Sequence, residues 1–195
     1  MGQLAENLRV LAWIDLSKKK QFLSRKDEWL VKELNISPDA AIRLLTRDEV
    51  LSDNHLSVLV MKFNLAEDVI LSGSLLTEIG INIFQENMVY LIAMLKKIDI
   101  SQKALAKEVG VDEHTISRWA KKASEPVGRS LGKFMVFIEE SLGKSVAVDL
   151  SKERLFLELS PPGRSFKREE LINLLNTLED NELEELYPAL IKLLN

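Results

Sequence analysis

Apolar residues recur at helical spacing along most of the chain, and few stretches show the strict alternation that marks a strand. This pattern predicts a mainly α-helical fold. The breaks between helices are few: Ser37 followed by Pro38 is typical of a helix start, and Gly80 interrupts the middle of the chain. On this spacing we expect a helix over residues 4–16 and more than one helix over residues 55–71.

The stretch at residues 145–159 departs from helical spacing. Apolar and polar positions alternate on both sides of a polar turn, with apolar residues at Val146, Val148, Leu150, Leu155, Leu157 and Leu159. Alternation of this kind favours a short β-hairpin. The same residues also fit a short helix capped by Ser151, so the sequence leaves both alternatives open.

A Pro-Pro-Gly sequence at residues 161–163 is the clearest linker. It is followed by two predicted helices, each with a leucine stripe, which would form a C-terminal helical hairpin within residues 161–195. Two helices of this size bury too little surface to fold alone. We therefore expect residues 165–195 to join two copies of the chain, to bind another protein or to dock on the body.

The segment SQKALAKEVGVDEHTISRW at residues 101–119 predicts two helices joined by a tight turn. Gly110 supplies the positive φ that ends the first helix, and Asp112 can cap the second. Helices joined so closely cross steeply and nearly touch, which favours a small residue such as Ala106 at the contact. The spacing buries one side of the pair, made of Leu105, Val109, Val111, Ile116 and Trp119.

This segment resembles the helix-turn-helix of the lambda-repressor-like family (XRE/Cro type). The matching features are Gln102 at the first helix, Leu-Ala at 105–106, Gly-Val at 110–111 and the run from Thr115 to Trp119. The resemblance covers residues 87–142, including a helix before the pair and a closing helix after it. It implies that the second helix of the pair enters the DNA major groove while the first meets the DNA backbone.

The resemblance also implies which residues contact DNA: Gln102, Lys103, Glu113, His114, Thr115, Ser117, Arg118, Lys121 and Lys122. Arg118 is the expected reader of sequence, because its guanidinium fork fits guanine; the alternative is an ion pair with a nearby acid. The lysines would neutralise phosphates. Asp112 and Glu113 depart from the family pattern, since they place two negative charges at the start of the recognition helix. These two acidic residues are compatible with a domain that binds DNA with high sequence selectivity, and equally with a domain that has lost DNA binding.

The charge of the chain is uneven. Its formal net charge of −4 argues against a protein that coats nucleic acid indiscriminately. Residues 96–133, however, hold nine Lys or Arg and five acidic residues. This local excess coincides with the helix-turn-helix segment, although a solvated helical surface would give the same count.

Residues 1–80 are predicted to be a degenerate second copy of the same domain. Residues 29–37 stand where residues 104–112 stand later, with Asn35 in place of the turn glycine. Pro38 and Asp39 occupy the groove-reading positions, and Asp39 would repel phosphate. We therefore predict tandem domains over residues 1–80 and 81–160, of which the second binds DNA. The alternative is one larger helical domain without duplication.

Several function classes have no support in the residues. The chain has no cysteine, and His55 and His114 are not spaced as metal ligands, so we expect no metal and no cofactor. No phosphate-binding glycine loop or nucleophile–histidine arrangement is present, which predicts a protein that is not an enzyme. No apolar run of about 18 residues occurs, and we expect a cytoplasmic protein without a membrane partner.

The leading functional prediction is a transcriptional regulator, expected to be a repressor that binds double-stranded DNA as a homodimer. Dimers of such proteins place two recognition helices on paired half-sites. The alternative is a protein-interaction adaptor that keeps the fold, has lost strong DNA binding and captures a partner through residues 165–195.

Overall fold

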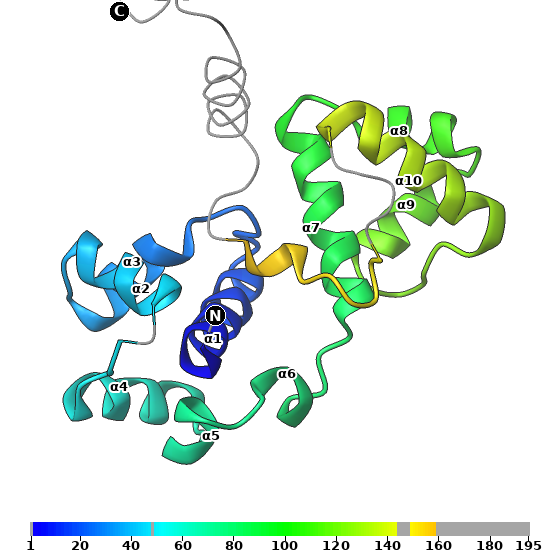
Figure 1. Ribbon diagram of the computed structural model, residues 1–195. Helices are drawn as coiled ribbons and strands as arrows, with labels where there is room; N and C mark the ends of the chain where they lie inside the picture. The colour runs from blue at the N-terminus through cyan, green and yellow to red at the C-terminus, as the bar shows by residue number, and fades with distance from the viewer. Residues whose placement is uncertain (1, 48, 144–148, 159–195) are drawn as a thin grey trace, which may run out of the picture. The chain divides into compact units, whose positions relative to one another are not determined.

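The computed structural model describes residues 2–47, 49–143 and 149–158, and these residues form the body of the chain (Figure 1). The described residues contain ten α-helices and one 3-10 helix, with no strand. The prediction of a mainly α protein is confirmed. The predicted C-terminal hairpin at residues 161–195 lies outside the described residues.

The first six helices form one group, with α1 at its centre. They are α1 (Gln3–Lys18), α2 (Lys26–Leu34), α3 (Pro38–Thr46), α4 (Asp53–Phe63), α5 (Glu67–Leu71) and α6 (Leu75–Glu78). Helix α1 contacts α2, α3, α5 and α6, and every residue from Asn7 to Trp13 is buried. Because seven successive residues point to all sides of a helix, α1 lies in the interior of this group.

The remaining elements form a second group, with α7 at its centre. They are α7 (Ile83–Lys97), α8 (Gln102–Val109), α9 (Glu113–Ala120), α10 (Gly128–Leu142) and the 3-10 helix η1 (Leu155–Leu157). Helix α7 contacts α9 and α10, and α8 contacts both α9 and α10. The 3-10 helix η1 contacts both α1 and α7, and in Figure 1 it is the orange segment between them.

Most helix ends follow local capping chemistry. Ser37 caps α3 by accepting a hydrogen bond from the backbone of Ala40, with Pro38 in the first turn as predicted. Residues 55–71 lie in two helices, as expected, because Asn64 adopts a left-handed conformation that ends α4. Helix α7 begins at Ile83, four residues before the start of the predicted family match, so Asn87 lies inside the helix.

The hairpin prediction needs correction. Leu155–Leu157, where the second strand was predicted, is one turn of 3-10 helix, and all three of its side chains are buried. Asp149 holds the preceding turn by accepting a hydrogen bond from the backbone N–H of Ser151. The residues of the predicted first strand at 146 and 148 lie outside the described residues.

An aromatic cluster joins the two groups of helices. The ring of Trp13 on α1 lies 5.2 Å from that of Phe156, 5.9 Å from Phe22 and 6.3 Å from Tyr90 on α7. Trp13 is only 2% exposed, and its indole Nε1 donates to the carboxylate of Glu86 at 2.9 Å. Trp13 therefore belongs to the core, and its partners come from the loop after α1, from α7 and from η1.

Two fully buried asparagines, Asn7 and Asn87, form hydrogen bonds to the backbone of residues 70–75 and 150–156, respectively. Asn7 donates through Nδ2 to the carbonyls of Ile70 (3.0 Å) and Gly73 (2.7 Å), and its Oδ1 accepts from the N–H of Leu75 (3.2 Å). Each of these bonds satisfies a backbone group that has been removed from water.

Asn87 makes an equivalent set of bonds. It donates to the carbonyls of Leu150 (2.8 Å) and Glu153 (2.6 Å) and accepts from the N–H of Phe156 (3.2 Å). In both sets the two carbonyls lie 63 and 66 residues after the asparagine. The same pattern of side-chain-to-backbone hydrogen bonds therefore occurs once in the group around α1 and once in the group around α7.

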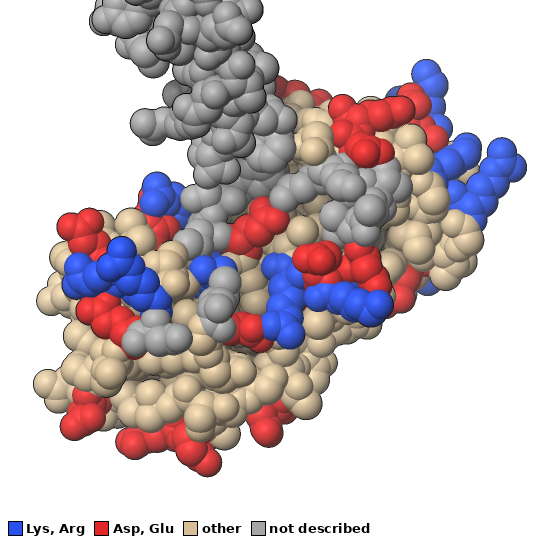
Figure 2. Space-filling model, in the orientation of Figure 1, with Lys and Arg blue, Asp and Glu red and all other residues tan. Residues whose placement is uncertain are grey.

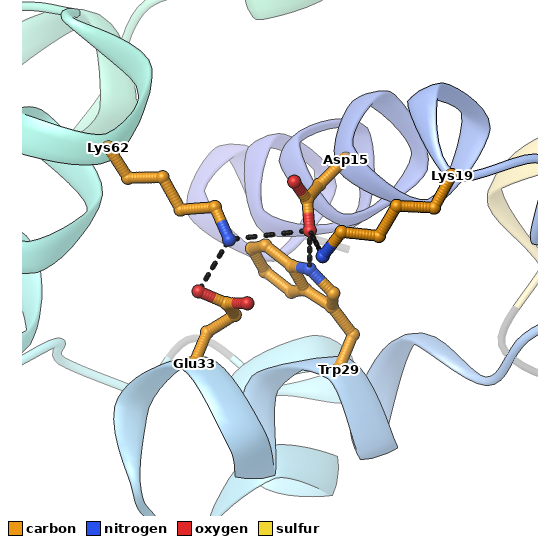
Figure 3. A network of polar contacts seen from close by, with 5 residues as sticks. All are labelled: Asp15, Lys19, Trp29, Glu33 and Lys62. Carbon is orange, nitrogen blue, oxygen red and sulfur yellow. Dashed lines mark hydrogen bonds and ion pairs between the residues drawn. The ribbon is translucent and has the colours of Figure 1, made fainter.

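A charged network on α1, α2 and α4 surrounds Asp15 (Figure 3). Its carboxylate accepts hydrogen bonds from Lys19 Nζ (2.7 Å), Trp29 Nε1 (2.8 Å) and Lys62 Nζ (3.3 Å). Lys62 also pairs with Glu33 at 2.5 Å. Burial alone would raise the pKa of Asp15, but these three donors outweigh burial and lower it to about 2.

Asp15 should make stability sensitive to acid. Because its pKa is lower in the folded than in the unfolded chain, ionised Asp15 stabilises the fold above about pH 4, and that stabilisation is lost as the pH falls toward about 2. We expect Asp15→Asn to lower the free energy of unfolding by about 1–2 kcal/mol at pH 5 and by much less near pH 2. Urea unfolding followed by circular dichroism at both pH values measures the difference.

The matched control is Asp99→Asn, because Asp99 is exposed and its left-handed backbone conformation suits asparagine. Its effect on the free energy of unfolding should stay nearly constant over the same pH range. An Asp15→Asn effect of equal size at both pH values would show that the carboxylate charge is not what stabilises this network.

Candidate nucleic-acid interface

Helices α8 and α9 are joined by a short turn, and each of the two helices begins at a side-chain cap. Ser101 accepts from the N–H of Ala104 at 3.1 Å at the start of α8. Gly110 ends α8 with φ of +79° and donates to the carbonyl of Ala106 at 2.9 Å. Asp112 then starts α9 by accepting from the N–H of Thr115 at 2.7 Å. The predicted roles of Gly110 and Asp112 are confirmed.

Gly110 is favoured at this position by its backbone conformation. A positive φ strains any residue with a Cβ atom, and a Cβ at this position would lie 3.0 Å from the ammonium of Lys133. Lys133, on α10, therefore places a positive charge beside the turn. The sequence indicated a basic residue in this region but not its position against Gly110.

The inner side of the α8–α9 pair is buried as predicted, except that Val111 in the turn is only half-buried. Its members, each at most 4% exposed, are Leu105, Ala106, Val109, Ile116 and Trp119. The Trp119 ring meets that of Phe134 on α10 edge-on, at a centroid distance of 6.2 Å. The closing helix thus fixes the rotation of α9 about its own axis, which determines the side chains that α9 presents outward.

The outer side carries most of the residues that the sequence assigned to DNA. The exposed members are Lys103, Glu113, His114, Arg118 and Lys121, and the half-buried members are Gln102, Thr115 and Ser117. Arg118 is exposed and makes no ion pair or side-chain hydrogen bond within the part of the chain that the structure describes. Its five N–H donors are available for an external acceptor.

Asp112 and Thr115 form two hydrogen bonds with each other. The Thr115 hydroxyl donates to the second carboxylate oxygen of Asp112 at 2.9 Å, in addition to the bond from the Thr115 N–H. The backbone bond first, and then the hydroxyl bond, lower the pKa of Asp112 below its ordinary value. The charge of Asp112 therefore caps α9, and the Thr115 hydroxyl points toward this cap.

Lys122 has a different position from the one predicted. It directly follows the last turn of α9, in a left-handed conformation with φ of 59°, and its ammonium pairs with Glu86 at 2.5 Å. Glu86 is also the acceptor for Trp13, so Lys122 belongs to the junction between α9, α7 and α1. Glu86 lies 36 residues away from Lys122, and no local pattern in the sequence links the two.

Charge is unevenly distributed on the visible face of the molecule (Figure 2). Lys and Arg side chains project at the edge nearest α8 and α10, where acidic side chains also lie, whereas the edge formed by α4–α6 shows acidic side chains and no basic ones. On this face, the edge at α4–α6 is therefore the less favourable one for an anionic partner.

No family model, no curated protein and no solved structure matches the chain. Among the described residues, no group of three or more His, Asp or Glu side chains could hold a metal ion. None of the helices in the described ranges has the length and apolar character needed to cross a membrane.

Proposed function

We propose that the chain is a sequence-specific double-stranded DNA-binding protein that acts as a transcriptional regulator, with α9 as the helix that enters the major groove. The observation that carries this proposal is Arg118, which projects from the outer side of α9 without a partner in the described body. A guanidinium fork held at this position suits the acceptor pair of guanine.

The geometry of α8 and α9 supports this proposal. The turn between Gly110 and Asp112 leaves one side of both helices buried and the other free, which is the arrangement that places a second helix in a groove while the first crosses the backbone. Gln102 and Lys103, at the start of α8, are assigned to phosphate contacts, and Lys121 to a phosphate beyond the recognition helix. Lys122 is assigned to the junction with Glu86 instead.

We also infer that the described body consists of two copies of one domain. The equivalent bonds of Asn7 and Asn87 support this inference, as do the two helix pairs α2–α3 and α8–α9. In each pair a residue with positive φ, Asn35 or Gly110, ends the first helix, and a side-chain cap two residues later starts the second. Arg43 on α3 is then the counterpart of Arg118 on α9.

The two counterparts differ in a way that favours α9 as the DNA-reading helix. The Arg43 guanidinium donates from Nε to both carboxylate oxygens of Glu49, at 3.0 and 3.2 Å, so this arginine is neutralised within the chain. Asp39 also places an exposed negative charge near the start of α3. We therefore assign sequence readout to α9 alone.

The proposed assembly on DNA is a homodimer on an inverted-repeat site. Symmetry of this kind lets one recognition helix from each copy reach a half-site, and it raises affinity without further contacts within one copy. The predicted dimer segment, residues 165–195, lies outside the described residues. Binding in a promoter would exclude the polymerase, which is the basis for proposing a repressor.

The decisive experiment selects a binding sequence from a random pool of duplexes with the full chain and then measures affinity by fluorescence anisotropy. We expect Arg118→Ala to weaken binding to the selected duplex by about 5-fold to 150-fold, with little change on an unrelated duplex. Lys121→Ala should weaken both duplexes alike and reduce the salt dependence of binding by about one counterion.

Arg43→Ala is the matched control, since it removes the equivalent arginine from α3, and it should leave DNA affinity within about twofold of the wild type. Failure to enrich any sequence, together with affinity that does not fall with salt, would contradict DNA binding and favour the protein-interaction adaptor. Equal losses for Arg43→Ala and Arg118→Ala would contradict the assignment of readout to α9.

A further inference from the structure

A groove of about 730 Å³ lies between the loop that follows α1 and the helices α7 and α8. Its floor is apolar and includes Val89 and Ile92 of α7, Leu105 of α8 and Phe22 of the loop. This volume is within the range of about 300–1,000 Å³ that is typical of small-molecule sites, which often lie between packed helices. The groove is therefore large enough for a ligand with an apolar body.

The charged residues that line the groove are all basic. Lys20 comes from the loop, and Lys96 and Lys97 come from the last turn of α7. All three are exposed and make no ion pair within the described ranges, and no Asp or Glu lines the groove. Gln102, the first residue of α8, adds an amide at the same site. An apolar floor with three unpaired cations is complementary to an amphipathic anion.

We propose that this groove binds a small amphipathic anion, a carboxylate with an aliphatic body of roughly ten carbons. The aliphatic part lies along the half-buried side chains of Phe22, Ala93 and Ile100, and the carboxylate meets the ammonium groups of Lys96 and Lys97. A neutral or cationic molecule of the same length lacks the second contact. This site shares Gln102 with the proposed DNA contacts, but it does not include the outer side of α9 and does not depend on DNA binding.

The test uses the full chain and decanoate as the probe, with decanol and decylamine as matched neutral and cationic compounds. Binding is measured by displacement of the fluorescent sulfonate 8-anilinonaphthalene-1-sulfonate. We expect decanoate to bind at least about fivefold more tightly than decanol. The double variant Lys96→Gln/Lys97→Gln should lose about 5-fold to 30-fold in decanoate affinity and keep its affinity for decanol.

Two further variants locate the site. Ala93→Trp, on α7, should fill the groove and abolish displacement by decanoate. Lys32→Gln/Lys107→Gln removes the same charge from exposed positions of α2 and α8 that do not line the groove, and it should change decanoate affinity by less than about twofold. Circular dichroism checks that each variant is folded.

Equal affinity for decanoate and decanol in the wild type would overturn the proposed recognition of an anion. An equal loss in the two double-lysine variants would place the effect in the overall charge of the chain and not in the groove. Full decanoate binding by a folded Ala93→Trp variant would likewise exclude the groove as the site.

Discussion

Asn87→Ala is expected to lower the free energy of unfolding by about 3–5 kcal/mol, because two buried backbone groups and one partly buried group lose a hydrogen-bond partner. The carbonyls of Leu150 and Glu153 lose the Nδ2 donor, and the N–H of Phe156 loses its acceptor. Each buried polar group without a partner costs about 1–3 kcal/mol. Asn7→Ala should have an effect of similar size, since Asn7 makes the equivalent bonds.

Urea unfolding at neutral pH, followed by circular dichroism, measures both effects. The control is Asn54→Ala, because Asn54 is exposed on α4 and makes no side-chain hydrogen bond within the described residues. That change should alter the free energy of unfolding by less than about 0.5 kcal/mol. A loss of under about 1 kcal/mol for Asn87→Ala would mean that this asparagine does not hold the closing segment.

Local chemistry accounts for the parts of the fold that the sequence predicted. Gly110, Asp112 and the Ser37–Pro38 pair act within one helical turn of their own positions, so their roles depend on neighbouring residues alone. The buried side of α8 and α9 is similarly encoded in a spacing of three and four residues. For these reasons the α8–α9 pair was predicted with nearly the observed bounds.

The contacts of Asn87 and Lys122 could not be predicted in this way. The partners of Asn87 lie more than 60 residues further along the chain, and Glu86 lies 36 residues before Lys122. Helical spacing carries no information at such distances, and for this reason the sequence predicted Lys122 to be a DNA-contacting residue. The only local sign was that a Glu-Asn pair occurs at residues 6–7 and again at 86–87.

The hairpin prediction was wrong over Leu155–Leu157 for a related reason. Alternation of apolar residues indicates a strand only if the residues between them are exposed, and here Phe156 is fully buried along with both leucines. Phe156 is apolar and packs against Trp13, a contact that spans 143 positions of the chain. Burial of three successive side chains breaks the rule of period two, and the segment forms a 3-10 turn.

Trp13→Ala is expected to lower the free energy of unfolding by about 3–5 kcal/mol. Trp13 fills the space between α1, α7 and η1, so truncation leaves a cavity and removes the contacts with Phe156, Phe22 and Tyr90. These contacts join α7–α10 to α1–α6. Limited proteolysis should therefore cut the connection at residues 79–82 faster in the variant, while unchanged urea unfolding and unchanged proteolysis would exclude a role for Trp13 at this junction.

Trp13→Phe separates packing from hydrogen bonding at the same position. Phenylalanine keeps an aromatic ring in the cluster but has no Nε1 donor, so Glu86 keeps only Lys122 as a partner in the described body. We expect a loss of about 1.5–3 kcal/mol, the range for a hydrogen bond to a charged group. In a Glu86→Gln background the same change should cost less, because an amide requires less compensation than a buried carboxylate. Equal costs in both backgrounds would show that Trp13 stabilises the junction by packing alone.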